Sequence, residues 1–346
     1  MTPATPGPSI RATIQQTVVL VAAIVALALL AIRLADVLLM AFGAILVAVL
    51  LNSLAEPLHN RLRLGRTLAL TIAVLVSVAC VSIAIWTFGR QAEAQFVALN
   101  EGLPRAWDEL QARLSSKPFG AAALAKLEDW RGFGWLVSLG PKLAADAAGS
   151  LVGTIIVVFA GLYLAYHPHS YVDGALLLLP PRRRQRALQI LNETYRALRQ
   201  WLIGQLFSMV LVGVTTGVGL AIAGVPSAAA LGLIAGLGQL VPVIGPMVAP
   251  LPGLLVALEA GPETLVWAGI VYLVSSQLEA NLITPLVLRQ LAQLPMAVTL
   301  FAVLAMGVLL GPLGVLFATP LSVVAYVFVR MIYVEGVLGE VLTPPE

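Results

Sequence analysis

The sequence predicts an all-α polytopic membrane protein. Hydrophobic residues make up 60% of the 346 residues and charged residues only 11%, a balance that ordinary soluble domains of this length do not show. Apolar runs of spanning length recur along the chain, and two further apolar runs are broken near their centres by proline and glycine. We therefore expect about six full transmembrane helices plus two oppositely directed re-entrant or broken helical hairpins, with a small helical extracytoplasmic insertion.

Six apolar runs are long enough to form the full transmembrane helices. They lie at 14–32, 37–54, 67–88, 151–166, 202–223 and 265–283. In the polar stretch between the third and fourth runs, apolar side chains recur every three or four residues from Phe96 to Leu114, which predicts a helix. That helix either caps its own chain or contacts another protomer, so a homo-oligomer is one expectation.

Basic residues predict the orientation of the chain. Arg61, Arg63 and Arg66 follow the second run, and a cluster of arginines follows the fourth. Arginine-rich loops stay in the cytoplasm, so both termini are expected there. The arginine cluster belongs to an amphipathic stretch that predicts an interfacial helix on membrane lipid, with no nucleic-acid partner. The expected units are a flexible arm at 1–13, transmembrane helices 1–3 at 14–89, the extracytoplasmic insertion at 90–148, transmembrane helix 4 at 149–167, the basic amphipathic helix at 168–200, a core at 201–334 and a C-terminal tail at 335–346.

The core contains two broken hydrophobic segments, at 225–259 and 294–330. In the first, the break leaves apolar arms of about a dozen residues, each covering roughly 20 Å, whereas the hydrocarbon core is about 30 Å thick. Neither arm spans the membrane alone, so a re-entrant hairpin is expected. The second segment breaks in the same way, and with the helix at 265–283 between them the two hairpins point in opposite directions. This arrangement predicts an inverted repeat of the kind found in secondary transporters.

Glu279 is the leading candidate for a coupling site. It is the only acidic residue between 201 and 329 that does not lie beside a hairpin or helix end. Burying an ionised carboxylate in a membrane is costly, so such a residue usually faces a protein interior or a water-filled cavity. Ser275, Gln277 and Asn281 extend the polar character of the same helix, Ser275 on the face of Glu279 and the other two flanking it. The alternative is a structural carboxylate hydrogen-bonded to an amide at a hairpin tip.

The two hairpin tips are the other candidate positions for a binding site. Breaks in a helix free backbone amides and carbonyls that bind a polar solute or an ion, although glycines there also permit close helix packing. The tip residues are Gln239, Pro242, Gly245 and Pro246 in the first hairpin, and Gly311, Pro312, Gly314 and Thr319 in the second. On the helix at 202–223, Gln205 and Ser208 are weaker candidates.

Catalysis and metal binding have no basis in the sequence. The chain lacks HExxH, GxSxG and Walker motifs, and its three histidines do not make a metal site. Cys80 is the only cysteine, which excludes an intrachain disulfide. We expect no enzyme activity, no metal and no cofactor.

The order of motifs in the core is similar to that of a known family. VPSAAALGLIAGLGQLVPVIGP, QLEANLITPLVL and GPLGVLFATPLSVV occur in that order between Gln200 and Arg330. This order resembles the autoinducer-2 exporter family of permeases. The resemblance implies a multi-spanning inner-membrane protein of bacteria that moves small solutes, with relatives linked to autoinducer-2 export and others to sodium–proton exchange, and it also implies oligomerisation.

These observations predict a secondary transporter or exporter of a small polar solute, such as a signalling molecule. Its site is expected between the two opposed hairpins and the helix of Glu279, with H⁺ or Na⁺ as a possible coupling ion. A sodium–proton antiporter and a passive channel are the alternatives of the same class. A membrane scaffold that transports nothing is the alternative of another class.

Overall fold

The computed structural model describes residues 30, 33–83, 85–86, 152–241, 244–283 and 296–339. Within these ranges every regular element is helical. Among the described residues, four helices are long and apolar enough to cross a membrane, and a fifth is if the pair Val152–Tyr166 and Pro168–Leu177, bent by 88°, counts as one span. The four are Ala35–Leu62, Arg66–Ile83, Pro181–Ile222 and Ala297–Val334. The chain is therefore an all-α polytopic membrane protein. The predicted arm at 1–13, nearly all of the helix at 14–32 and the insertion at 90–148 lie outside the described residues.

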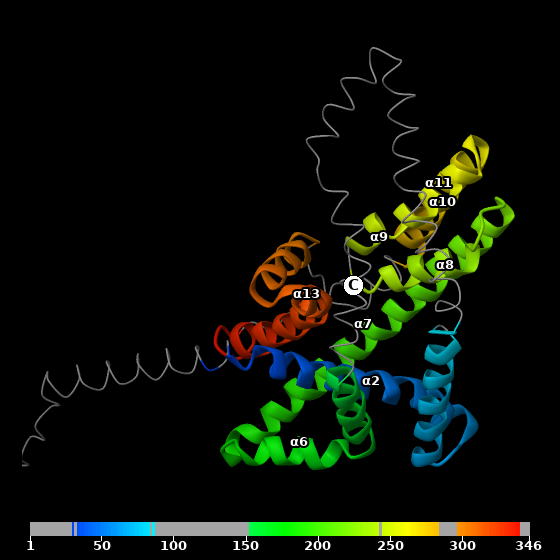
Figure 1. Ribbon diagram of the computed structural model, residues 1–346. Helices are drawn as coiled ribbons and strands as arrows, with labels where there is room; N and C mark the ends of the chain where they lie inside the picture. The colour runs from blue at the N-terminus through cyan, green and yellow to red at the C-terminus, as the bar shows by residue number, and fades with distance from the viewer. Residues whose placement is uncertain are drawn as a thin grey trace, which may run out of the picture.

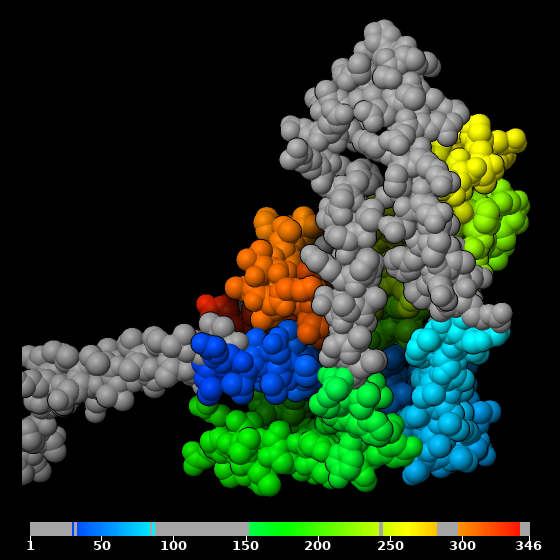
Figure 2. All heavy atoms as spheres, viewed as in Figure 1, coloured from blue at the N-terminus to red at the C-terminus, as the bar shows by residue number. Residues whose placement is uncertain are grey.

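Two helices of the N-terminal half pack against α2 (Ala35–Leu62). The helices Arg66–Ile83 and Val152–Tyr166 bury alanine and leucine side chains against it. A methyl group added at Gly161 would lie 2.7 Å from the Val47 side chain, so only glycine allows the fourth predicted helix to come this close. Figure 2 shows α2 in blue lying against the green region that begins at residue 152 and beside the cyan helix.

The chain turns sharply after α2 and again after the helix Val152–Tyr166. α2 ends at Leu62, and the next residue, Arg63, has a left-handed φ of 52°. Across this turn His59 Nδ1 lies 2.6 Å from the Leu64 carbonyl oxygen. After Tyr166, Pro168 occupies the first turn of α6 (Pro168–Leu177), because proline lacks the N–H that a continuing helix needs.

A single helix of 42 residues, α7 (Pro181–Ile222), forms the centre of the structure. The amphipathic helix and the fifth transmembrane helix, expected as two units that meet at residue 200, are continuous in it. No glycine or proline occurs between Arg182 and Ile203, and arginine, leucine, alanine and glutamine all favour helix. Figure 1 shows α7 running from the level of α6 past α2 towards the end that carries α10 and α11. It contacts α2, α8, α11 and α13.

α8 (Ala228–Gly238) folds back against α7 with the two backbones in direct contact. The chain reverses through Gly224 and Ser227, both with positive φ. A methyl group at Gly232 would lie 2.6 Å from the Gly213 carbonyl oxygen, and one at Gly236 would lie 2.6 Å from the Met209 carbonyl oxygen. These glycines therefore set the distance between α7 and α8.

The first predicted break is present. After α8 the helix stops, and the short α9 (Ile244–Val248) and then α10 (Pro250–Ala260) follow. Gly245 lies directly on the carbonyl group of Gly238, which leaves no room for a side chain there. α10 then packs beside α11 (Pro262–Leu278), where Gly253 lies against the Tyr272 hydroxyl. α11 continues as a turn of π-helix, η1 (Glu279–Ile283).

The second predicted break lies inside α13 (Met296–Phe328). Gly311 has φ 66° and ψ −151°, so the two arms are separate helices. A methyl group at Gly307 would lie 2.9 Å from the Val315 side chain, and Gly314 lies on the Met306 carbonyl, so the arms contact each other beside the break. The second arm packs on α2, where the rings of Phe42 and Phe317 meet edge to face at 5.9 Å. The helix ends in a second π-turn, η2 (Val329–Val334).

Candidate functional site

The Glu279 carboxylate lies where α7, the end of α8 and α11 meet. Its Oε1 accepts a hydrogen bond of 3.1 Å from the Ser208 hydroxyl of α7. The Gln239 side chain, at the end of α8, also hydrogen-bonds the Glu279 carboxylate. Ser208 is only 4% exposed, whereas Glu279 is half-buried. A partly accessible acid with buried hydrogen-bond partners can bind a cation or exchange a proton without losing its position.

The break after α8 is attached to the same region of α7. The Gln205 side-chain amide donates a hydrogen bond of 2.6 Å to the Gln239 carbonyl oxygen, which the end of α8 leaves without a partner in its own helix. Gln205 and Ser208 are three residues apart, so they project from the same side of α7. We call Gln205, Ser208, Gln239 and Glu279 the polar cluster. It connects the first hairpin tip to the carboxylate through α7.

The α-to-π transition in α11 occurs at Glu279 itself. The Glu279 backbone N–H still bonds to the carbonyls of Ser275 and Ser276, whereas the following residues wind more widely. Single π-turns inside α-helices are frequent at functional sites. Ser275, one turn earlier, is buried.

The predicted residues on this helix do not all point the same way. Asn281 and Gln277 are exposed, and the Asn281 side-chain amide bonds to the Gln277 carbonyl oxygen at 2.8 Å and to its side chain at 3.4 Å. The structure therefore groups Ser275 with the buried side of α11 and separates Gln277 and Asn281 from it.

At the first tip, Gly245 is buried and Pro246 half-buried, next to the break. Gly245 permits the close return of the chain over Gly238. The prediction for Pro242 falls outside the described residues. Gln239 is the tip residue whose polar groups the structure brings to Glu279.

The second tip has different surroundings. Gly311 and Pro312 are accessible, Gly314 is buried, and Thr319 is buried with no hydrogen-bond partner for its hydroxyl among the described residues. Within the described part of the chain no hydrogen bond joins this tip to the polar cluster. A site shared by both tips therefore stays a prediction.

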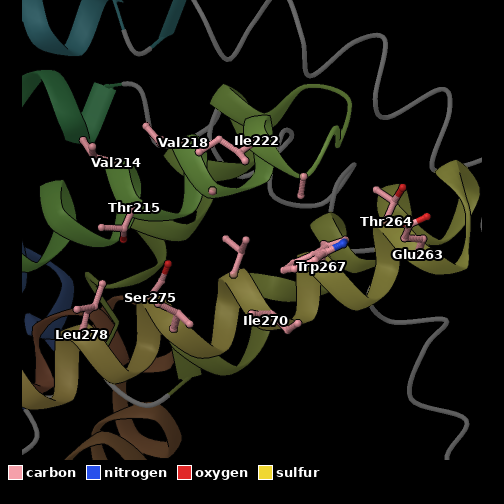
Figure 3. A pocket seen from close by; sticks show the side chains of 14 residues that line it. Val214, Thr215, Val218, Ile222, Glu263, Thr264, Trp267, Ile270, Ser275 and Leu278 are labelled. Atoms are coloured by element: carbon pink, nitrogen blue, oxygen red, sulfur yellow. The ribbon is translucent and has the colours of Figure 1, made fainter.

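A groove of about 840 Å³ opens between α7 and α11, and its lining includes Ser275 and Leu278, which precede Glu279 in α11. Figure 3 shows its apolar middle, with Val218 and Ile222 from α7 and Ile270 from α11. Thr215 and Ser275 supply hydroxyl groups at one end. Glu263, Thr264 and Trp267 lie at the other end. The groove therefore suits the apolar part of a ligand, with polar groups near both ends.

Metal-binding geometry is not found in the described ranges. No group of three or more His, Cys, Asp or Glu side chains comes close enough there to hold a metal ion. Cys80, the single cysteine, is exposed and free.

The sequence indicates Gln205 and Ser208 only as weaker candidates, whereas the structure places both in the polar cluster. Both are polar residues in an otherwise apolar run, three residues apart. That spacing is the available signal, because polar groups on one side of a membrane helix usually face the protein interior or a water-filled cavity.

Comparison with known proteins identifies the family. The sequence pattern of the AI-2E family transporters matches residues 18–333, nearly the whole chain. The chain belongs to the AI-2E transporter family. Three relatives are named as putative transport proteins: YueF and YrrI of Bacillus subtilis and MT0215 of Mycobacterium tuberculosis.

The relatives match this AI-2E family transporter to different extents. YueF is 30% identical over half of this chain, YrrI is 28% identical over 44% of it, and MT0215 is 30% identical over 80% of it. The matches span about half the length of the two Bacillus proteins and 78% of MT0215. Family and apolar helices together make this protein a multi-pass membrane protein of the AI-2E transporter family.

Proposed function

We propose that this AI-2E family transporter is a secondary carrier, an exporter of a small polar solute, whose coupling site is the Glu279 carboxylate. The observation that supports the proposal most directly is the hydrogen bond from Ser208 to Glu279 beside the broken end of α8. Discontinuous helices close to a lone membrane carboxylate are the arrangement in which secondary transporters hold substrate and coupling ion.

The polar cluster suggests how an ion would act on the tip. An ionised Glu279 accepts a hydrogen bond from the Ser208 hydroxyl and interacts with the Gln239 side chain. The Gln205 side-chain amide donates a hydrogen bond to the Gln239 carbonyl oxygen. A proton or Na⁺ on the carboxylate competes with these donors for its lone pairs. Ion binding therefore weakens the contact between the first hairpin tip and α11. The ion then interacts differently with the two conformations, which is what a ligand needs in order to drive a conformational change. H⁺ or Na⁺ is accordingly the coupling ion in this proposal.

The substrate would lie where the polar cluster adjoins the groove between α7 and α11. Ser275 lies one turn from Glu279 and also lines that groove. A small molecule with several hydroxyl groups, such as the signalling molecule for which the family is named, has the polarity that this end of the groove accommodates. The second hairpin tip completes the site from the opposite side as the transporter changes conformation.

The basic regions of the chain support an inner-membrane orientation with cytoplasmic termini. Arg199 of α7 pairs with Glu56 near the end of α2 at 2.7 Å, and Arg186 pairs with Glu335 in the C-terminal segment at 3.0 Å. These pairs gather both arginine-rich regions and the C-terminal segment at one end of the protein. Under the positive-inside rule that end faces the cytoplasm.

The test is transport by the purified protein in liposomes that carry pH- and sodium-sensitive dyes, with each ion gradient imposed in turn. A carrier shows saturation and counterflow of solute, and its flux follows one of the gradients. Flux that never saturates and ignores both gradients identifies a passive channel. Ion exchange with no solute identifies a sodium–proton antiporter, and no movement of any kind supports a scaffold.

A further inference from the structure

A second cavity, of about 470 Å³, lies at the end of the protein opposite the α10–α11 turn. It is enclosed by the last turns of α2, the start of the helix Arg66–Ile83 and the arginine-rich part of α7. We call it the basic pocket. The charged and ring-bearing side chains that line it are Glu56, His59, Arg66, Tyr195, Arg196 and Arg199.

The basic pocket has more positive charge than its own acids neutralise. Three arginines line it together with a single carboxylate, that of Glu56, which pairs with Arg199 at 2.7 Å. Arg196 bonds to Glu193, but this pair is exposed on both sides and therefore weak. Arg66 makes no ion pair within the described part of the chain, so its charge is available to a ligand.

One buried hydrogen-bond donor in the pocket also lacks a partner among the described residues. The Arg199 Nε is buried, and nothing among the described residues accepts its hydrogen. A buried N–H without an acceptor is unfavourable, and a bound anion would supply the missing acceptor. The Tyr195 hydroxyl also lines the pocket and is a further donor.

A phosphate group matches this set of donors. Guanidinium groups bind phosphate oxygens through pairs of parallel hydrogen bonds, and several of them around one cavity favour a tetrahedral anion with many acceptors. Basic pockets between membrane helices at the cytoplasmic surface are where anionic head groups bind. We propose that the basic pocket binds a phosphate group, carried by an anionic phospholipid or by a soluble phosphate compound. The proposal is independent of the transported solute.

Native mass spectrometry of the detergent-purified protein tests this proposal and separates the two sources. One arm adds phosphatidylglycerol or phosphatidylcholine, and the other adds inorganic phosphate or pyrophosphate. Retention of phosphatidylglycerol alone assigns the site to lipid, and retention of pyrophosphate or phosphate assigns it to a soluble compound. If phosphatidylcholine is retained as well as phosphatidylglycerol and neither phosphate binds, the pocket has no anion selectivity and the proposal is wrong.

Three variants place the binding in the pocket. Arg66→Gln is expected to weaken binding about tenfold, the effect of losing one charge-assisted hydrogen bond. Arg66→Lys retains the charge and should restore part of the affinity. Arg183→Gln is the matched control, because Arg183 is an exposed arginine of α7 that does not line the pocket. Equal losses in Arg66→Gln and Arg183→Gln, or no loss in either, would overturn the proposal.

Discussion

The hydroxyl of Ser208 lies 3.1 Å from Oε1 of Glu279, although 71 residues separate them in the chain. The contact joins the middle of α7 to the point at which α11 changes from α- to π-helix. Two residues of α7, Gln205 and Ser208, therefore restrain both the tip of the first hairpin and the carboxylate. A change at Glu279 can reach the break in the membrane helix through one side of α7.

Replacing Glu279 with glutamine should remove the dependence of transport on the ion gradient. Glutamine has nearly the same shape but carries neither a charge nor an exchangeable acidic proton. The measurement is solute flux in liposomes under imposed pH and sodium gradients. Glu259→Gln is the matched control, because Glu259 is an exposed acid near the end of α10 and does not line the groove. Wild-type gradient dependence in Glu279→Gln would exclude this carboxylate as the coupling group.

Replacing Ser208 with alanine should strengthen binding of the coupling ion while the protein stays folded. The change removes a donor that competes with the ion for the carboxylate lone pairs, which is worth roughly 1.5–3 kcal/mol, or about tenfold or more in affinity. The measurement is the coupling-ion concentration at half-maximal flux. Ser322→Ala is the control, because the Ser322 hydroxyl bonds only to the Ala318 carbonyl of its own helix. Equal shifts in both variants would show that the Ser208 contact has no special role.

Adding a methyl group between α7 and α8 should destabilise the protein. At Gly232 the new atom would lie 2.6 Å from the Gly213 carbonyl oxygen, which is backbone and cannot rotate away, so Gly232→Ala is expected to cost about 1–3 kcal/mol. Thermal unfolding in detergent measures the loss. Gly269→Ala is the control, because nothing lies within 4 Å of that position in α11 and alanine favours helix. An unchanged unfolding temperature in Gly232→Ala would contradict the close packing of these helices.

The position of both breaks could be predicted from the sequence, because proline and glycine act locally on the backbone. Gly311 interrupts an apolar helix with a backbone angle that excludes a side chain, and Gly245, just after the first break, has a contact that excludes one. Glu279 could also be identified, since an acid inside an apolar run has few alternatives to a functional or buried polar role. The absence of glycine and proline between Arg182 and Ile203 is consistent with one continuous helix, α7. The change from polar to apolar residues at Trp201 instead suggests a boundary between two helices.

The partners of Glu279 could not be predicted, because they depend on how the helices pack. Ser208 reaches the carboxylate only because Gly232 and Gly236 bring α8 onto α7 and α11 packs along the same helix. A sequence shows that such glycines permit close contact but does not show which helix supplies it. For the same reason Gln277 and Asn281, polar neighbours of Glu279 in the chain, were grouped with it although they bond to each other instead.

Replacing Gly311 with alanine should destabilise the second hairpin. Its φ of 66° with ψ of −151° lies in a region that residues with a side chain scarcely occupy, and the strain is expected to cost about 1–3 kcal/mol. Nothing lies within 4 Å of the added methyl group, so the effect comes from the backbone alone. Gly174→Ala is the control, since Gly174 lies in α6 without a positive φ and also has open space around it.

Thermal unfolding and transport together decide what the Gly311 break does. If the break only lets the arms of α13 pack, Gly311→Ala should lower the unfolding temperature and leave the flux per folded protein at the level of Gly174→Ala. If the break is part of the moving transport core, the flux per folded protein should fall as well, because alanine favours a continuous helix over the bent one. Wild-type stability in Gly311→Ala would show that the backbone at this break is not held in the glycine-only conformation.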